Sequence, residues 1–567
     1  MRFCTKNYLQ IIQSVCLLVF FSCPFLTQAQ TNYIPYGSKD YNLLDRLEIK
    51  TRLDGLSYST VKPYPRKQVV EQVELIDSLL QANNGNYAGI TATDAYNIQS
   101  LLMGNSEWSK PRDYYLSKKP ILKNFFVTKP NVFELKNKDF FFVFNPLIQF
   151  SYGKENGNSQ ALFQNTRGIS MRGMISNKIG FNLYLTENQE RDPLYVQAWT
   201  NQFKAVPGAG FYKDYKTTGV DYFDARGSVS WNVAKFIDMQ FGYDKNSIGA
   251  GYRSLLLSDF GNSALFFKIN TRIWKFNYEN LFMELFPQHD RGGNELFSRK
   301  YARFNHLSIN ATRWLNVGLF EGVIFGRKDH FDFQYMLPVM FLRPAESNNG
   351  SADNAVIGLD AKANIAKKFQ VYGQLLVDEF KASEVFSKRG WWGDKIGYQL
   401  GVKYIDIFGL KNVDLQLETN RIRPYTYSHN DSVANYTHYN QPLAHPLGAN
   451  LQEYIAILKA QVFKHLYITG KYIHYFQGLD SAGINFGSNI FIDYNTRPRD
   501  YGFSVGSGDK ATCNLYSLGL TYEVKENIFF DVTALRRTYN VASSGAKNTT
   551  VFSVGFRWNL PKREFDF

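Results

Sequence analysis

The sequence has 567 residues, enough for several soluble domains or for one large β-barrel with a small accessory domain. Its mean hydropathy is negative and no run of about 18 apolar residues follows the N-terminal region, which excludes a helical membrane protein. The net charge of +14 falls to +12 without Arg2 and Lys6. For an exported chain this favours acidic glycan or lipid phosphate as a partner over nucleic acid.

Residues 1–30 predict a secretory signal peptide. Basic residues precede a mostly apolar stretch at 11–21, and small residues near Ala29 offer a cleavage site. The alternative is a lipoprotein signal with Cys23 acylated, although aromatic residues stand where small or aliphatic ones are wanted. Cys513 is the one cysteine left in the mature chain, so we expect no disulfide framework, no zinc site and no cofactor.

Residues 31–135 predict a small periplasmic helical domain. The segment 66–80 places valine, isoleucine and leucine at helical spacing, and 91–102 does the same after Thr91, which has capping-box spacing to an acidic residue. The apolar residues of 43–49 suggest a third short element. Each apolar stripe is too short to be stable alone, so the three should pack together or against something larger.

From residue 136 to 567 the apolar residues change to a period of two, which is typical of strands with one apolar and one polar face. In the hairpin 516–537 each arm has about 10 residues, the length of a tilted membrane-spanning strand. We count eighteen candidate strands, at 138–152, 162–176, 178–190, 224–235, 237–243, 263–274, 277–286, 303–314, 316–326, 354–365, 369–378, 394–407, 412–421, 449–462, 464–476, 510–524, 526–537 and 550–560.

The connections between these strands alternate between short and long. Bacterial outer-membrane barrels have this asymmetry, with tight periplasmic turns and long external loops. The fold expected is therefore a mainly β protein, an antiparallel transmembrane β-barrel of about 18 strands with an N-terminal helical domain. The even strand count predicts a bacterial outer-membrane protein with long loops outside and both termini periplasmic.

The last strand alternates as cleanly as any, with its lipid-facing side formed by Phe552, Val554, Phe556, Trp558 and Leu560. The chain ends at an aromatic residue, Phe567. A terminal aromatic residue after an amphipathic strand predicts recognition by the barrel-insertion machinery. A high aromatic content, 16% of the chain, also fits girdles at two lipid interfaces, which makes outer-membrane lipid the expected surroundings.

The sequence offers little that predicts catalysis. Asp378 and Glu379 are adjacent in a strand, so they point to opposite faces, and we expect a solvated pair at the external rim. The eight histidines form no HxxxH or HxH pair, and no GxSxG, phosphate loop or HExxH occurs. The enzymatic alternative is a catalytic site in which Ser, His and acidic side chains meet in the barrel wall. We expect a protein that is not an enzyme.

The long loops combine aromatic residues with Asn, Asp, Arg and Gly, as at 249–259, 389–394 and 435–450. Aromatic faces stack on sugar rings, while Asn and Arg bind hydroxyl and carboxylate groups. The plainer alternative for any single Trp or Tyr is anchoring at the membrane interface.

Four stretches resemble the Wzi-type capsule assembly proteins of the outer membrane, in the longer form also known as gliding-motility RemB-like proteins. They are 41–50 (YNLLDRLEIK), 251–259 (GYRSLLLSD), 343–358 (RPAESNNGSADNAVIG) and 436–450 (YTHYNQPLAHPLGAN). The resemblance implies an eighteen-stranded barrel, a periplasmic helical bundle against its lower mouth, and a non-catalytic role in attaching or organising surface polysaccharide.

The leading hypothesis is therefore a capsular polysaccharide anchor whose lumen is closed by inward-folding loops. Its expected glycan-binding residues, from two external loops, are Arg343, His438, Tyr439, Asn440 and His445. The first alternative is a gliding-motility component, for which gliding or surface-assembly proteins would be the partners. The second alternative is a solute channel.

Overall fold

The computed structural model describes residues 32–176, 178–290, 296–341 and 353–567. Within these residues, eighteen strands form a closed antiparallel barrel, as the alternation predicts. The sheet closes where the last strand pairs with the first, with Val554 opposite Tyr152. The predicted signal peptide and Arg343 lie outside the described residues.

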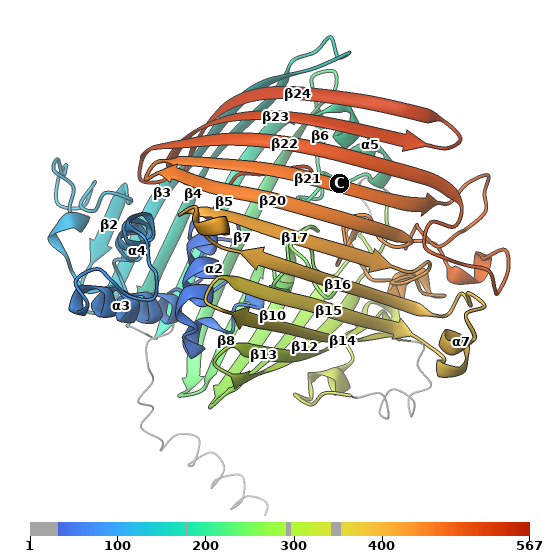
Figure 1. Cartoon of the computed structure of the whole chain (residues 1–567), viewed down its shortest axis with the longest axis horizontal. Helices are drawn as coiled ribbons and strands as arrows, with labels where there is room; N and C mark the ends of the chain where they lie inside the picture. Colours follow the sequence, from blue (N-terminus) through green and yellow to red (C-terminus); the bar gives the residue numbers. More distant parts are fainter. Residues whose placement is uncertain (1–31, 177, 291–295, 342–352) are drawn as a thin grey trace, which may run out of the picture.

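The wall strands follow one another around the barrel in chain order (Figure 1). They are β3 (Phe140–Glu155), β4 (Leu162–Ile175), β5 (Ile179–Arg191), β7 (Gly219–Ala234), β8 (Ile237–Asp244), β10 (Ala264–Ile273), β11 (Phe276–Leu285), β12 (Lys300–Thr312), β13 (Leu315–Phe325), β14 (Asn354–Ile365), β15 (Phe369–Glu379), β16 (Lys395–Tyr404), β17 (Val413–Ile422), β20 (Leu451–Phe463), β21 (Leu466–Leu479), β22 (Asp509–Lys525), β23 (Ile528–Val541) and β24 (Gly545–Trp558).

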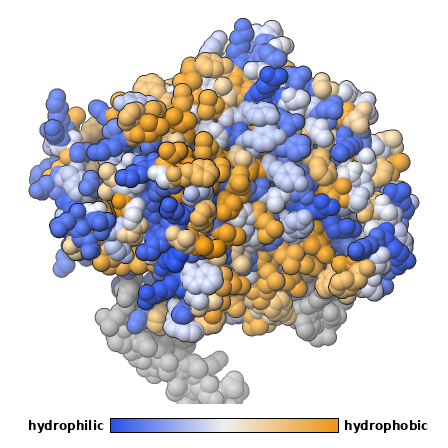
Figure 2. All heavy atoms as spheres, in the orientation of Figure 1, coloured by the Kyte–Doolittle hydropathy of each residue, from blue (hydrophilic) through white to orange (hydrophobic). Residues whose placement is uncertain are grey.

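The outward face of the wall is apolar. On β22 the side chains of Tyr516, Leu518 and Tyr522 are exposed, whereas Glu523, which follows Tyr522 on the other face, is buried. Figure 2 shows hydrophobic residues over the middle of the wall and hydrophilic ones toward its two ends. Leu560 is an exception to the predicted lipid-facing set, because β24 ends at Trp558 and Leu560 is buried beyond it.

Three helices pack together at the short-turn end of the barrel: α2 (Asp40–Thr51), α3 (Arg66–Ala82) and α4 (Ala92–Gly104). Their apolar stripes form one buried cluster, and the predicted capping box of Thr91 with Asp94 is present. Within the described residues, two further helices lie in long connections, α5 (Leu194–Phe203) and α7 (Ala382–Ser387), and the sequence pattern did not predict them. None of the helices in the described ranges is both long and apolar enough to cross a membrane.

Six short strands complete the described sheet structure. β2 (Phe133–Lys136) pairs with the lower part of β3, beyond the end of β24, and β6 (Lys213–Tyr215) pairs with β7. The others are paired inside or above the lumen: β1 (Val61–Lys62), β9 (Ser247–Ile248), β18 (Thr437–His438) and β19 (Gln441–Pro442).

Candidate functional site

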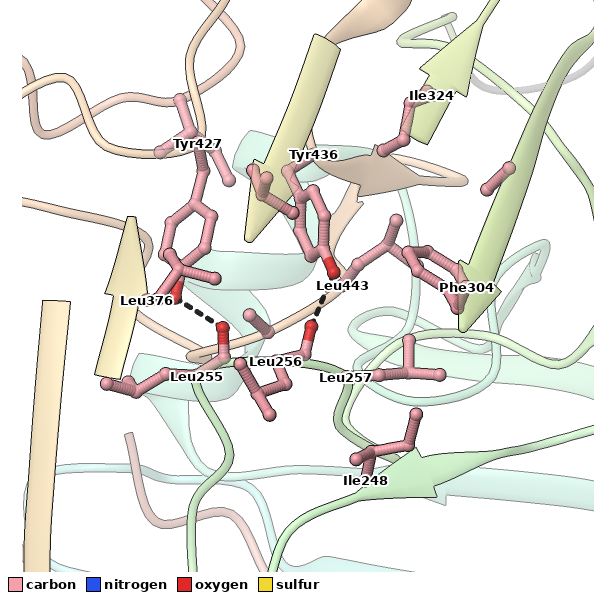
Figure 3. Packing of buried hydrophobic residues seen from close by; sticks show 14 of the residues in the cluster. Ile248, Leu255, Leu256, Leu257, Phe304, Ile324, Leu376, Tyr427, Tyr436 and Leu443 are labelled. Carbon is pink, nitrogen blue, oxygen red and sulfur yellow. Dashed lines mark hydrogen bonds between the residues drawn. The ribbon is translucent and has the colours of Figure 1, made fainter. Parts of the chain in front are cut away.

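The long connection between β8 and β10 folds into the barrel. Leu255, Leu256 and Leu257 of this connection are fully buried in an apolar cluster with side chains from the wall. The hydroxyl of Tyr427 donates to the carbonyl of Leu255 at 2.8 Å, and that of Tyr436 donates to Leu256 (Figure 3). The segment 251–259 (GYRSLLLSD) therefore forms a plug inside the barrel and is not an exposed loop.

A strand from the helical end meets this plug inside the lumen. Val61 of β1 pairs with Ile248 of β9, and the amide of Gly249 donates to the carbonyl of Thr60 at 2.8 Å. The ammonium of Lys62 donates to the carbonyl of Gly249 at 3.0 Å. The lumen is thus occupied from both ends, which argues against a water-filled channel along this side of the barrel.

The four described residues of the predicted glycan site belong to the packing around this plug. His438 is buried, its Nδ1 accepting from the amide of Phe286 at 3.1 Å and its Nε2 lying 3.0 Å from the carbonyl of Ser263. Burial lowers the pKa of His438 to about 4, so the ring is neutral near pH 7. It cannot supply a positive charge to an anionic sugar.

Asn440 and His445 are also buried and bound to protein groups. Asn440 exchanges hydrogen bonds with the backbone of His289, and Nε2 of His445 lies 2.8 Å from a carboxylate oxygen of Glu453. Tyr439 is half-buried with its ring 4.6 Å from that of His289. The structure brings these residues close to the loop β8–β10 but gives their polar atoms protein partners, and sugar binding by them stays a prediction.

The expected solvated pair at the rim is wrong for one member. Asp378 is buried and accepts a hydrogen bond from the amide of Tyr427 at 2.8 Å, because the loop that carries Tyr427 folds inward over it. Glu379 lies 3.3 Å from the ammonium of the buried Lys395, and the register of β15 against β16 shifts between Val377 and Glu379. The irregularity interrupts the strict alternation expected there, and the two carboxylates do not form a solvated rim pair.

Two other long connections join at the end of the barrel opposite the helices. These are 380–394, between β15 and β16, and 480–508, between β21 and β22. The amide of Trp392 donates to the carbonyl of Asp500 at 3.0 Å, and the amide of Phe503 donates to Gly390 at 2.9 Å. This backbone pairing fixes the two connections against each other.

Aromatic and basic side chains gather where these connections meet. We call the following set the aromatic–basic surface: Trp392, Tyr494, Tyr501, Arg389, Arg497 and Arg499. The rings of Trp392 and Tyr494 have centroids 4.8 Å apart, and the guanidinium of Arg497 lies 4.0 Å from the Trp392 centroid. Arg389 lies in the same way over Tyr501, at 4.4 Å.

The positive charge of this surface that stays available to an anionic ligand is that of Arg499. Arg389 pairs with Glu384 and Arg497 pairs with Asp500, both at 2.8 Å. Arg389 and Arg499 are exposed, while Trp392 and Tyr494 are half-buried and so held in place. Burial raises the pKa of Tyr494 to about 12, so its hydroxyl stays neutral and can donate. Stacked rings can pack against sugar faces, and guanidinium groups bind carboxylates in pairs of hydrogen bonds.

The run 389–394 is one of the loops whose composition suits a glycan, but none of its residues was predicted as a site. What the sequence pattern lacked was the partner segment, since 480–508 is about 100 residues away along the chain. The adjacent tryptophans were the only available signal. The contact depends on which loops meet above the barrel, which periodicity does not determine.

A second concave region lies lower in the lumen, beside the C-terminal tail 559–567. The cavity is about 150 Å³ and has basic, acidic and hydroxyl groups in its lining, among them Lys471, Arg563, Glu564 and Asp566. These charges pair with one another or with the wall: Lys471 with Asp566 at 2.7 Å and Arg563 with Glu190 at 2.8 Å. The region is thus internally neutralised. Among the residues with described positions, no cluster of metal-ligating side chains is found.

The C-terminus differs from its predicted periplasmic position. Phe567 is buried within the barrel, with its ring 5.7 Å from those of Trp199 and Phe260, and Arg253 binds Asp566 at 3.0 Å. The tail turns back into the lumen because its charged residues find buried partners there (Figure 1). Recognition of Phe567 by insertion machinery stays a prediction, which concerns the chain before it folds.

Among known proteins, similarity is found in the fold. No family model and no curated protein matches the sequence. Among solved structures, Wzi of Escherichia coli, described as an outer membrane protein involved in group 1 capsule assembly and a carbohydrate-binding β-barrel, aligns with a TM-score of 0.53 and 11% identity, over 95% of this chain and 100% of that one.

Two further solved structures align less well. Pseudomonas aeruginosa OprD has a TM-score of 0.42 and 12% identity over 74% of this chain and 94% of its own. Acinetobacter baumannii OccAB2 has a TM-score of 0.41 and 10% identity over 74% and 98%. Together with the closed wall, the likeness to Wzi supports the fold of an outer-membrane β-barrel.

Proposed function

We propose that the protein is a non-catalytic anchor or assembly factor that binds an acidic surface polysaccharide at the outer mouth of its barrel. The observation that carries the proposal is the aromatic–basic surface. It lies on the long-loop connections, and the proposal places these outside the cell and the helical domain in the periplasm. A net positive chain charge is consistent with an anionic partner.

The binding step follows from the side chains themselves. Sugar rings would stack against the exposed parts of Trp392 and Tyr494, which packing holds in one orientation, so little side-chain entropy is lost. Arg499 is exposed and donates to the carbonyl of Gly502 at 3.2 Å, which leaves further N–H groups for a uronic acid carboxylate. Such contacts hold a polymer without cleaving it.

The likeness to a carbohydrate-binding barrel that takes part in capsule assembly supports the same class of ligand. The occupied lumen supports an anchor over a channel, because the plug cluster and β1 fill the side of the barrel that they line. Attachment of a capsule and its organisation at the surface are both consistent with a fixed binding surface at the mouth.

The test is binding of purified acidic polysaccharide to the protein in detergent. We expect Trp392→Ala and Arg499→Gln each to weaken binding about tenfold, equivalent to ~1.4 kcal/mol, and binding to fall as salt rises. Trp274→Ala is the matched control, since Trp274 is an exposed tryptophan next to the short connection between β10 and β11. Equal affinity for all four proteins would reject the site.

A gene deletion separates the remaining roles. The proposal expects loss of retained capsule with gliding intact. Loss of gliding with normal capsule would reject it in favour of a motility component, and recovery of motility proteins in place of glycan from the purified complex would do the same.

A further inference from the structure

A narrow hairpin leaves the helical domain beside β2. Leu116 and Thr128 form a bridge at its base, Ile121 and Phe125 form another at its tip, and the amide of Ser117 donates to the carbonyl of Val127 at 2.9 Å. We call residues 116–128 the basal hairpin. It is not used by the proposed function.

The basal hairpin extends the sheet of the barrel wall. Phe125 pairs with Phe133 of β2, and Phe133 pairs with Phe144 of β3. Directly opposed residues on antiparallel strands share a face. Phe144 lies on the same face of β3 as Phe150 and Tyr152, which are exposed on the outside of the barrel.

Ring contacts show that this outer face is continuous. The centroids of Phe125 and Phe133 are 5.1 Å apart, those of Phe133 and Phe142 6.2 Å, and those of Phe142 and Phe181 6.4 Å. Phe181 belongs to β5, which is two strands around the wall from β3 and three from β2. The apolar surface that faces lipid therefore continues from the wall into the hairpin.

The basal hairpin exposes several apolar side chains together, and Leu116 and Phe125 are among them. Leu122 is 80% exposed and Ile121 is 57% exposed. Three exposed lysines surround them, Lys118, Lys119 and Lys123. Apolar tips flanked by lysine are typical of segments in a membrane interface, where the apolar part enters the acyl region and the ammonium groups reach lipid phosphates.

The position of the hairpin fits that environment. It lies at the short-turn end of the wall with the helical domain, close to β2 at the left of Figure 1. Lipid that covers the outward rings of β3 and β5 would reach the hairpin without a break.

We propose that the basal hairpin binds the phospholipid leaflet at the short-turn end of the barrel, with Ile121, Leu122 and Phe125 in contact with acyl chains and the three lysines on phosphate groups. The partner is a lipid surface. The proposal rests on the outer-membrane location and does not depend on glycan binding.

The experiment places a fluorescent label on single cysteines in the full chain, in a Cys513→Ala background. Leu122→Cys is compared with Leu75→Cys, which lies on α3 of the same domain and is 45% exposed. The barrel is reconstituted in vesicles of phosphatidylethanolamine and phosphatidylglycerol with brominated acyl chains. Heat-modifiable migration on gels confirms that each variant is folded.

We expect bromolipid to quench the label at position 122 at least threefold more than the label at 75, and aqueous iodide to show the reverse order. Lys118→Glu, Lys119→Glu and Lys123→Glu together should reduce the bromolipid quenching at 122. Equal quenching at 122 and 75, or free access of iodide to 122, would overturn the proposal and leave the hairpin as a surface for a protein partner.

Discussion

Single residues hold the helical domain against the barrel. Arg46 of α2 donates to Asp94 of α4 at 2.7 Å and to Asp406, in the short connection between β16 and β17, at 2.9 Å. Burial alone would raise the pKa of Asp94, but the ion pairs with Arg46 and Lys50 outweigh burial and hold that pKa well below its ordinary value. One guanidinium thus joins two helices to the wall.

Replacing Arg46 should release the helices. Arg46→Ala leaves the buried Asp94 with Lys50, at 2.7 Å, as its remaining cationic partner, and we expect docking to lose about 1.5–3 kcal/mol. The measurement is amide hydrogen exchange in α2 and α4, which should become faster while exchange in the wall strands stays slow. Glu71→Gln is the control, because Glu71 is exposed and 4.0 Å from Lys67, a pair worth at most about 1 kcal/mol. Unchanged exchange in the Arg46 variant would contradict this assignment.

The same pair predicts a pH dependence. A carboxyl whose folded pKa lies below its unfolded value, about 3.9 for Asp, contributes stability above the unfolded pKa and loses it as the pH falls through the folded pKa. Protection of α2 and α4 should therefore stay constant from about pH 8 to pH 5 and decline only below about pH 4. Release of the helices near pH 6 would show that another group controls docking.

At the scale of elements, the aromatic–basic surface depends on how closely two loops approach. Gly390 has a φ of +68° and a Cβ there would lie 2.5 Å from the carbonyl oxygen of Phe503. Any side chain at this position would push the loop 380–394 away from 480–508. The surface is therefore set by backbone geometry as well as by its aromatic residues.

Gly390→Ala should separate the loops. We expect weaker glycan binding and faster trypsin cleavage at Arg499. The strain of a left-handed backbone with a side chain is about 1–3 kcal/mol before the clash is counted. Gly483→Ala is matched to it, since Gly483 has a φ of +77° in the partner loop and no atom within 4 Å of its Cβ position. Equal loss of binding in both variants would mean that backbone strain, and not loop separation, is responsible.

At the scale of the whole molecule, loop side chains fill part of the lumen and pack against one another there. Tyr427 and Tyr436 come from the connection between β17 and β20, and they hold Leu255 and Leu256 of a loop from the opposite wall (Figure 3). An apolar cluster of this size inside a barrel gives it the character of a protein core, from which water and ions are excluded.

Removing 436–450 should open this core. We expect the intact protein to give no steady conductance in planar bilayers, and the deletion variant, which lacks Tyr436 and the His445–Glu453 contact, to give one. Loss of glycan retention by this deletion would then reflect an unseated plug as well as lost contacts, so Trp392→Ala is the cleaner test of binding. Stable channel steps from the intact protein would contradict a closed lumen.

The sequence by itself determined the wall and the three helices of the N-terminal segment. All eighteen predicted strands are present, and 354–365 matches β14 residue for residue. The alternation is visible among neighbouring residues, because the apolar side chains of a membrane-spanning strand must all point to the lipid face. The largest errors fall where a strand extends beyond the membrane, as at Gly219 and Gly545. At 545–549 the residues are mostly polar on both faces, and at 219–223 apolar and aromatic residues are consecutive, so a strict period of two is absent in both.

Only the tertiary structure decided what fills and covers the barrel. The segments 251–259 and 436–450 have the composition of exposed glycan-binding loops, yet both are packed in the lumen, and the tail with Phe567 joins them there. Composition records which groups a loop carries, but whether they meet solvent or one another depends on contacts between segments 100 to 300 residues apart, as in Tyr252 with Asp566. Such contacts leave no periodic trace in a single sequence.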